Sequence, residues 1–249
     1  MISLRPIEAG DCPRVVRLHR AAFPPGEIAC TIFGAPGVAR YLASLLAFPR
    51  YQPEHALWGA WDGERLAGYA HFRELPEAWH LNQIAVHPAY RGCGVGRLLW
   101  ERFAAEGACR GCSRLSLDVE SGNLPVIAWY RRRGLREAGC TWRYERETLP
   151  GAAREPEAGS LRLLGWEQAE AWQQRYGFSS FQVLHQGRAW PIGRLGRVYF
   201  RAGEALPTAV EAALAEIDPG RRLLLFAAEP LNLPGFRPRG SSLRMLGEL

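Results

Sequence analysis

The chain of 249 residues contains no lysine, and its longest apolar runs, such as 223–228, are no longer than a single strand. A membrane helix needs roughly 18 or more consecutive apolar residues, so no membrane span is predicted. The first eleven residues include an arginine and a proline before any apolar stretch could form the core of a signal peptide. These absences predict a cytoplasmic protein without a membrane partner.

The six cysteines lack the regular spacing of a small disulfide-bonded domain, which favours reduced thiols. Cys109 and Cys112 have the CxxC spacing. No second CxxC or nearby Cys/His pair completes a four-ligand zinc site, so we expect no metal. Structural zinc or redox chemistry is one interpretation of this pair, and a helix-to-strand turn that contains two small, half-buried residues is the other.

The net charge is +6, and every basic residue other than histidine is arginine. A moderate positive charge suits a polyanionic ligand as well as a nucleic acid. Because no DNA- or RNA-binding motif is found, no nucleic-acid partner is expected.

Short apolar or alternating runs predict strands, and longer runs with helical spacing predict helices. Strands are expected at 2–5, 56–61, 65–74, 79–86, 114–119 and 136–148, and helices at 13–23, 37–48, 94–106 and 124–133. The stretch 150–160 is rich in Pro, Gly and Ala and is predicted to be a linker. Beyond it, strands are expected at 179–186, 194–201, 222–228 and 242–246, and a helix at 207–217. The predicted domains are therefore 1–150 and 161–249.

A faint repeat relates the ends of these domains. Residues 134–144 match 235–245 without a gap, at an offset of 101 (235 − 134 = 101), and 114–117 resemble 222–225. Too few residues follow the strand of the second copy to hold the helix expected in the first. The second domain is interpreted as a truncated half-copy; chance similarity is the alternative.

The segment 81–99, LNQIAVHPAYRGCGVGRLL, combines a strand, a proline-bearing turn, a glycine-rich loop and an amphipathic helix. Glycines at 92, 94 and 96 leave room for backbone N–H groups to face an anion, and the helix N-terminus adds unpaired donors and its dipole. A pyrophosphate is the expected ligand.

This loop resembles the acetyl-CoA signature of the GNAT superfamily of N-acetyltransferases, [QR]-x-x-G-x-[GA]. The resemblance implies that the loop holds the pyrophosphate of acetyl-CoA. Its residues are Arg91, Gly92, Cys93, Gly94, Val95, Gly96 and Arg97. It also implies that the main chain of Ile84, Ala85 and Val86 pairs with the pantetheine arm as an added strand.

Two other interpretations of the loop were weighed. One is a glycine-rich turn that binds nothing. The other is a dinucleotide-binding fingerprint, G-x-G-x-x-G, with Asp118 about 20 residues further on. The third glycine of that fingerprint would be position 97, which is arginine, and five residues separate strand and loop.

A second GNAT-like element follows between 115 and 135. The resemblance predicts a strand, then an asparagine and a helix with a tyrosine seven residues later, and Asn123 and Tyr130 fit this spacing. Ala128 comes later than the usual alanine, and Leu135 replaces the usual phenylalanine. The resemblance covers roughly residues 1–150.

Acyl transfer needs a neutral amine, stabilisation of an oxyanion and a proton for the departing thiolate. By resemblance, Tyr130 donates that proton and the Val86 N–H stabilises the oxyanion. The alternative for Tyr130 is a buried structural tyrosine. Asn123 bonds the pantetheine or caps its helix.

The general base is less defined. An unbroken strand would place residues 80, 82, 84 and 86 on one face, so that His80 and Asn82 face the acceptor. His80 and Asp118 are the candidate bases, and water is the alternative.

The resemblance implies an α/β protein with the GNAT fold, in which a central mixed, mostly antiparallel sheet is flanked by helices and followed by a smaller α/β GNAT-like domain. The second domain has no glycine loop, Asn or Tyr at the matching positions and is predicted to be catalytically silent. The predicted function is transfer of an acetyl or short acyl group from acetyl-CoA to an amine of a small molecule or peptide by a monomer or homodimer. A non-catalytic acyl-CoA sensor and an NAD-dependent oxidoreductase are the alternatives.

Overall fold

The computed structural model describes residues 1–48, 50–51, 53–147 and 161–249. The predicted linker at 150–160 lies outside these residues. The chain forms two compact units, and each contains segments from both halves of the sequence. Unit 1 comprises 1–25, 39–139 and 242–249, and unit 2 comprises 26–38 and 140–241. The two predicted contiguous domains, 1–150 and 161–249, thus differ from the observed units, which interleave along the chain.

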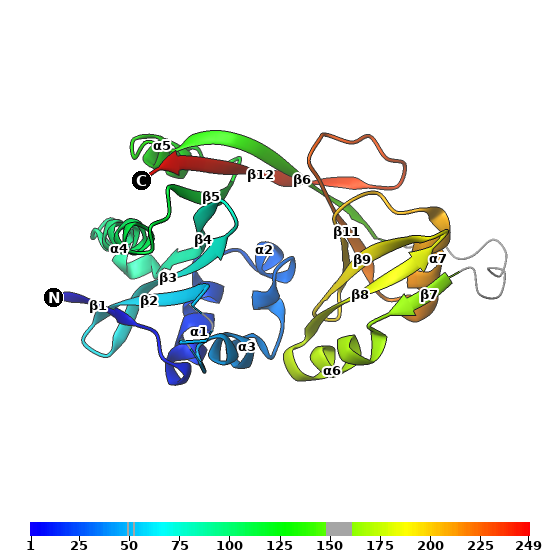
Figure 1. Ribbon diagram of the computed structural model, residues 1–249, viewed down its shortest axis with the longest axis horizontal. Coiled ribbons are helices and arrows are strands. Elements are labelled where there is room, and N and C mark those ends of the chain that lie inside the picture. Colours follow the sequence, from blue (N-terminus) through cyan, green and yellow to red (C-terminus); the bar gives the residue numbers. More distant parts are fainter. Residues whose placement is uncertain (49, 52, 148–160) are drawn as a thin grey trace. The chain divides into compact units, whose positions relative to one another are not determined.

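Unit 1 contains most of the predicted strands and helices (Figure 1). Its strands are β1 (Ile2–Pro6), β2 (His55–Asp62), β3 (Arg65–Leu75), β4 (Ala78–Val86), β5 (Arg114–Glu120), the first residues of β6 (Arg136–Arg146) and the last of β12 (Arg237–Glu248). Its helices are α1 (Cys12–Ala22), most of α3 (Val38–Leu45), α4 (Val95–Cys109) and α5 (Leu124–Arg131). The strand order is β1-β2-β3-β4-β5-β12, antiparallel except for the parallel pair β4 and β5.

The two faces of this sheet differ in chemistry. One face packs against α4 and α5 through an apolar core that includes Phe72, Trp79, Leu117 and Met245. The other face carries Tyr69, whose hydroxyl bonds His19 of α1 at 2.6 Å. Polar side chains continue along this second face, which we call the polar face.

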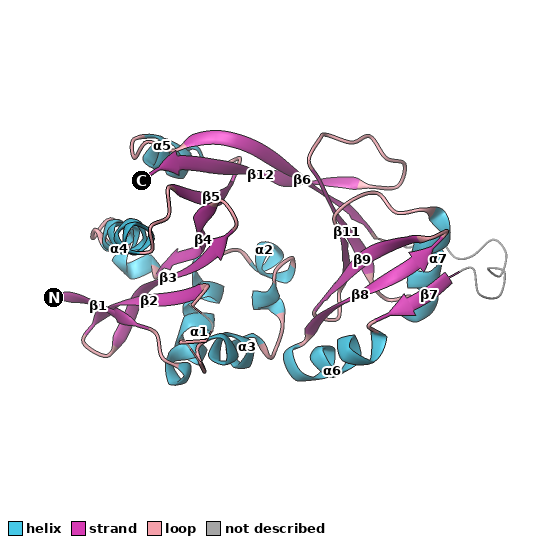
Figure 2. Cartoon of the chain, viewed as in Figure 1, coloured by secondary structure: helices cyan, strands magenta, loops and turns pink. Residues whose placement is uncertain are grey.

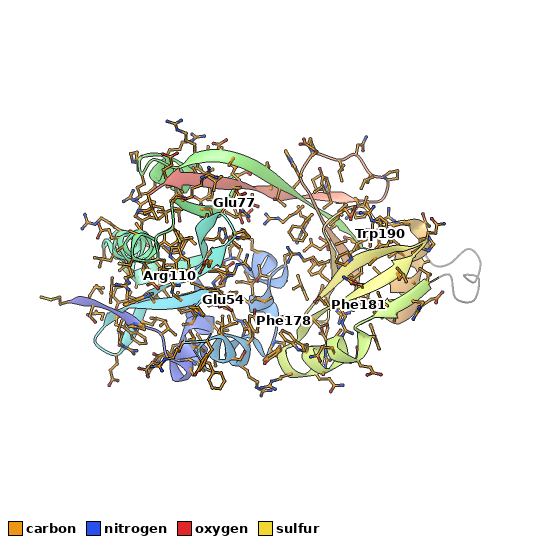
Figure 3. The ribbon with its side chains drawn as sticks, in the orientation of Figure 1. Glu54, Glu77, Arg110, Phe178, Phe181 and Trp190 are labelled. Carbon is orange, nitrogen blue, oxygen red and sulfur yellow. The ribbon has the colours of Figure 1, made fainter. Side chains whose placement is uncertain are left out.

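Unit 2 has its own apolar core, which includes Phe181 and Trp190 (Figure 3). Unit 2 includes α2 (Pro25–Ala29) from residue 26 onward, the rest of β6 and the first residues of β12. Its other elements are β7 (Leu161–Leu164), α6 (Trp166–Tyr176), β8 (Phe178–His185), β9 (Arg188–Leu195), β10 (Tyr199–Ala202), α7 (Thr208–Ile217) and β11 (Arg222–Ala227). No helix separates β11 from β12, as the interpretation of a truncated copy requires.

The strand predicted at 194–201 is instead two strands, β9 and β10, because Gly196 turns the chain with φ 56°. Helix α6 was not predicted, since its sequence WEQAEAWQQRY has little apolar periodicity. Cys109 ends α4, and Gly111 with φ 70° forms the turn before β5. In the described part of the chain, no group of three metal-ligating side chains is found, and no helix is long and apolar enough to cross a membrane.

The internal repeat corresponds to equivalent strands. β6 begins at Arg136 and β12 at Arg237, each preceded by a glycine with positive φ, Gly134 at 86° and Gly235 at 79°. Residues 242–248 of β12 pair with β5, and residues 142–146 of β6 pair with β11. The last strand of each copy therefore pairs with a strand of the other copy: β6 of the first copy pairs with β11, and β12 of the second copy pairs with β5 (Figure 2).

Candidate functional site

The glycine-rich loop lies between β4 and α4. A 3-10 turn at Pro88–Tyr90 follows β4, and the loop ends at Gly94, which is the N-cap of α4. Gly92 and Gly94 have φ of 78° and 81°, a left-handed backbone conformation that residues other than glycine rarely adopt. The backbone conformation thus explains these two glycines. The turn also separates strand from loop, which disagrees with a dinucleotide-binding fingerprint.

Backbone donors are free around this loop. Among the described residues, we find no hydrogen bond from the backbone N–H of Gly92, Gly94, Val95, Gly96 or Arg97. The first N–H groups of a helix lack intrahelical acceptors, and the helix dipole adds partial positive charge there. The loop can therefore hold a phosphate or pyrophosphate group.

The remaining loop residues are exposed. The Cys93 side chain is exposed, and the Arg97 side chain is 65% exposed beside Glu101. Arg91 donates from Nη2 to the Ala22 carbonyl at 3.0 Å, which ties the loop to the end of α1.

Gly68 of β3 allows α4 to start this close to the sheet. A Cβ at this position would lie 2.7 Å from Val95 Cγ1 and 3.0 Å from the Ala85 carbonyl oxygen. Any side chain at 68 would push the beginning of α4 away from the end of β4.

The second half of β4 has one unpaired edge. β4 and β5 pair in parallel only from Trp79–Leu115 to Leu81–Leu117, whereas β3 pairs with β4 as far as Val86. We call the point where β4 and β5 separate the fork. Beyond it, no strand of the described residues pairs with the edge of residues 82–86 that faces away from β3, and we call this edge open. It includes Ile84, Ala85 and Val86, the residues predicted to pair with pantetheine.

A β-bulge corrects the expected face of β4. Leu81 pairs with Phe72 and Gln83 with His71, which leaves Asn82 as an extra residue. His80 and Asn82 therefore both lie on the polar face, but Ile84 and Val86 pack against the apolar core on the opposite face. The expectation that residues 80, 82, 84 and 86 share one face is wrong, because the extra residue shifts the alternation.

His80 lies just before the fork, 3% exposed. Its Nδ1 is 2.9 Å from Ser116 Oγ, and its Nε2 is 3.8 Å from Asp118 Oδ2. Burial lowers the pKa of His80 to about 4, against the opposing effect of Asp118. The imidazole is therefore neutral at pH 7.

Asp118 is held by an arginine from β12. Arg244 donates from Nε to Asp118 Oδ1 at 2.6 Å and from Nη2 to Oδ2 at 3.0 Å. The bidentate guanidinium thus occupies both oxygens of the carboxylate. Of the two predicted bases, His80 thus makes fewer hydrogen bonds than Asp118.

The sequence analysis did not identify His71, a second buried histidine on the polar face, as a candidate site residue. His71, 3% exposed, lies with Nδ1 3.0 Å from Gln83 Oε1 and 3.0 Å from Asn82 Nδ2, and with Nε2 3.0 Å from His55 Nδ1. Burial lowers the pKa of His71 to about 4. Only the strand register and the bulge bring these side chains together.

Tyr130 lies in α5 on the apolar face, 4% exposed, with its ring centroid 5.5 Å from that of Trp100. Burial raises the pKa of its hydroxyl, which is therefore protonated at pH 7. We find no hydrogen bond from this hydroxyl to any described residue. Asn123 is the N-cap of α5, but its side chain makes no capping bond. The capping alternative is therefore not realised, and the amide is free for a ligand.

Part of the chain matches a known protein family. Residues 17–135 match the model of the Acetyltransferase (GNAT) family. The N-alpha-acetyltransferase RimI of Mycobacterium tuberculosis is 34% identical over 101 residues, 38% of this chain and 60% of that protein. The mycothiol acetyltransferase of Corynebacterium glutamicum (strain ATCC 13032) is 31% identical over 87 residues, 34% of this chain and 30% of that protein. The chain thus spans less than two thirds of the length of these relatives.

A solved structure resembles the whole chain. A tandem GNAT protein from the clavulanic acid biosynthesis pathway aligns over 100% of this chain and 98% of its own, with a TM-score of 0.71 and 17% sequence identity. At this identity the likeness concerns the fold alone. It confirms the predicted α/β fold class and the tandem arrangement of two GNAT-like parts.

Proposed function

We propose, on the premise that this chain belongs to the GNAT acetyltransferase family, that it transfers an acetyl or short acyl group from acyl-CoA to an amine. The observation that carries the proposal is the loop from Arg91 to Arg97, with its free N–H groups, beside the open edge of β4. Both features suit the two parts of CoA that GNAT enzymes hold, the pyrophosphate and the pantetheine arm.

The reaction is a direct attack. The amine nitrogen bonds to the thioester carbonyl carbon, and the carbonyl oxygen becomes an oxyanion next to the Val86 N–H. The carbon–sulfur bond then breaks, and the thiolate takes the proton of the Tyr130 hydroxyl. The products are an N-acyl amine and CoA.

The amine loses one proton in this reaction. We assign its acceptance to His80, because it is neutral at pH 7 and lies on the polar face just before the fork. Its low pKa makes it a weak base, so an amine that arrives neutral reacts fastest. In this proposal Asp118 positions His80 and does not itself take the proton.

Thermal-shift measurements with acetyl-CoA, CoA and NAD test the cofactor, because a ligand that binds only the native state raises its stability. We expect acetyl-CoA and CoA to raise the melting temperature and NAD to leave it unchanged. A screen of amines for CoA release then tests catalysis. Stabilisation by acetyl-CoA without CoA release from any amine would favour the non-catalytic sensor, and stabilisation by NAD alone would overturn the proposal.

A further inference from the structure

Arg73 lies on the polar face of unit 1, at the centre of its histidines. It pairs across the sheet with His55 on β2 and with His80 on β4. Cross-strand partners share a face and lie about 5 Å apart at Cβ. Burial is the main cause that lowers the pKa of His55, His71 and His80, and the positive charge of Arg73 lowers each further. The guanidinium is thus close to all three rings.

Arg73 has no partner in the part of the chain that the structure describes. It forms no ion pair or hydrogen bond there, and its Nε is buried and unbonded. Arg110 of the same unit, labelled in Figure 3, is the contrast: it donates to the Pro53 carbonyl and to Glu106, and it lies 4.3 Å from the centre of the Trp79 ring. A partly buried cation without a counter-charge is unfavourable.

The acids on or beside this face are already engaged or do not reach Arg73. Asp118 is held by Arg244. Glu120, two residues further along β5, has interactions of its own. Glu54 acts on His55, and among the described residues it forms no ion pair with Arg73. The counter-charge for Arg73 therefore has to come from outside this set.

Arg73 is also near the place where acyl transfer would occur. Its partner His80 belongs to the second of the three parallel pairs that precede the fork. Since a strand rises about 3.3 Å per residue, one or two residues separate this position from the fork by roughly 3–7 Å. A group held by Arg73 would lie within a few bonds of a reacting amine.

We infer that Arg73 binds an anionic group of the acceptor, so that the acceptor is an amine with a carboxylate or phosphate close to its nitrogen. The inference rests on the proposed acyltransferase function. A guanidinium pairs with either anion through two parallel N–H bonds, which would fix the amine relative to the thioester. Amines that carry only positive charge lack a group for this site.

Matched amines test the inference in the full-length protein. CoA release from acetyl-CoA is measured with L-phenylalanine against 2-phenylethylamine, and with phosphoethanolamine against ethanolamine. We expect the anionic member of at least one pair to have a kcat/KM about tenfold to a hundredfold higher, the scale of a hydrogen bond to a charged group. The pair that shows the difference identifies carboxylate or phosphate as the anion.

Substitution of Arg73 locates the effect. Arg73→Gln should remove this advantage, mainly through KM, and leave the neutral amine almost unchanged, whereas Arg73→Lys should keep part of it. The matched control is Arg114→Gln, because Arg114 is an exposed arginine of unit 1 that pairs with Glu77 at the surface. It should behave as wild type. Equal use of both members of both pairs, or equal loss for both in Arg73→Gln, overturns the inference.

A binding measurement separates this inference from the proposed function. If no amine releases CoA, the melting temperature of the CoA complex is measured with each matched pair. A rise with the anionic member in wild type that is absent in Arg73→Gln supports the anion site even though acyl transfer has failed. No difference between the members overturns it. CoA release that ignores the anion overturns the inference and leaves the proposed function standing.

Discussion

Units 1 and 2 contain the same strand–helix–strand arrangement but differ in the chemistry around it. In unit 1, β4 is joined through α4 to the parallel strand β5, and in unit 2, β10 is joined through α7 to the parallel strand β11. Each helix covers an apolar core of its own unit. The strand–helix–strand arrangement is therefore common to both.

The connections differ in chemistry. The unit 1 connection ends in a glycine N-cap with positive φ, whereas α7 is preceded by Pro207 with φ −58°. Glu204 lies in the unit 2 connection, where it bonds Arg188 at 2.6 Å. A carboxylate and a proline offer negative charge and no N–H, the opposite of what a phosphate needs.

The strand edges differ as well. β4 continues past the fork with an open edge, but every residue of β10 is paired with β11, and residues 199–201 are also paired with β9. The comparison teaches that the candidate cofactor site comes from the loop and the fork. The shared strand and helix alone do not provide it.

The largest effect should come from charge in the loop. Gly94→Glu places a carboxylate where the pyrophosphate would bind, and like charges in contact cost several kcal/mol. We expect at least a hundredfold loss of acetyl-CoA affinity, at about 1.4 kcal/mol per factor of ten. Isothermal titration calorimetry measures it. Gly203→Glu is the control in unit 2, because a Cβ there meets nothing within 4 Å, and it should bind normally.

Backbone strain is a separate effect of Gly94→Glu, since φ is 81° at this position. Gly94→Asn carries no charge, and asparagine tolerates a left-handed conformation. It should retain more affinity than the glutamate variant. If a folded Gly94→Glu protein binds acetyl-CoA as wild type does, this loop is not the cofactor site.

Removal of one tyrosine hydroxyl from each unit tests the difference between the units. Tyr130→Phe should lower kcat about a hundredfold, the usual scale of general acid catalysis, with acetyl-CoA affinity nearly unchanged. Tyr144 of unit 2 accepts a hydrogen bond from the Leu231 N–H at 2.7 Å. Tyr144→Phe should therefore reduce the free energy of unfolding by about 1 kcal/mol and leave kcat unchanged.

Steady-state kinetics, acetyl-CoA titration and urea unfolding of both tyrosine variants check this contrast. Unchanged turnover in Tyr130→Phe would remove the hydroxyl from the mechanism. Parallel losses of affinity and turnover would instead make Tyr130 a structural residue.

Acid should weaken unit 1 through its buried histidines. The pKa of His71 and of His80 is about 4, below the ordinary value of 6.5, so the unfolded chain protonates first as the pH falls. Their contribution to stability is complete above pH 6.5 and is lost progressively as the pH falls from about 6.5 to 4. The free energy of unfolding is measured by urea titration across this range.

His71→Gln should make that decline shallower, because the variant lacks this buried histidine. Identical slopes for wild type and His71→Gln would show that burial of this histidine does not govern acid stability.

Much of unit 1 could be predicted because its signals are local. The glycine spacing at 92, 94 and 96 indicates an anion-binding loop within one short segment, and the GNAT-like spacing of Asn123 and Tyr130 lies within another. The polar face could not be predicted, because it depends on register between strands. The bulge at Asn82 adds one residue that no residue pattern marks, and the partner of Asp118 lies 126 positions away, at Arg244.

The exchange of closing strands imposes an order on folding during synthesis. β5 gains its second neighbour, in addition to β4, only when residues 242–248 have been made, although β6 begins about a hundred residues earlier. At 5–20 residues per second, ribosomes need roughly 5–20 s for that interval. Until then the edge of β5 stays uncovered, and an open strand edge invites pairing with other chains.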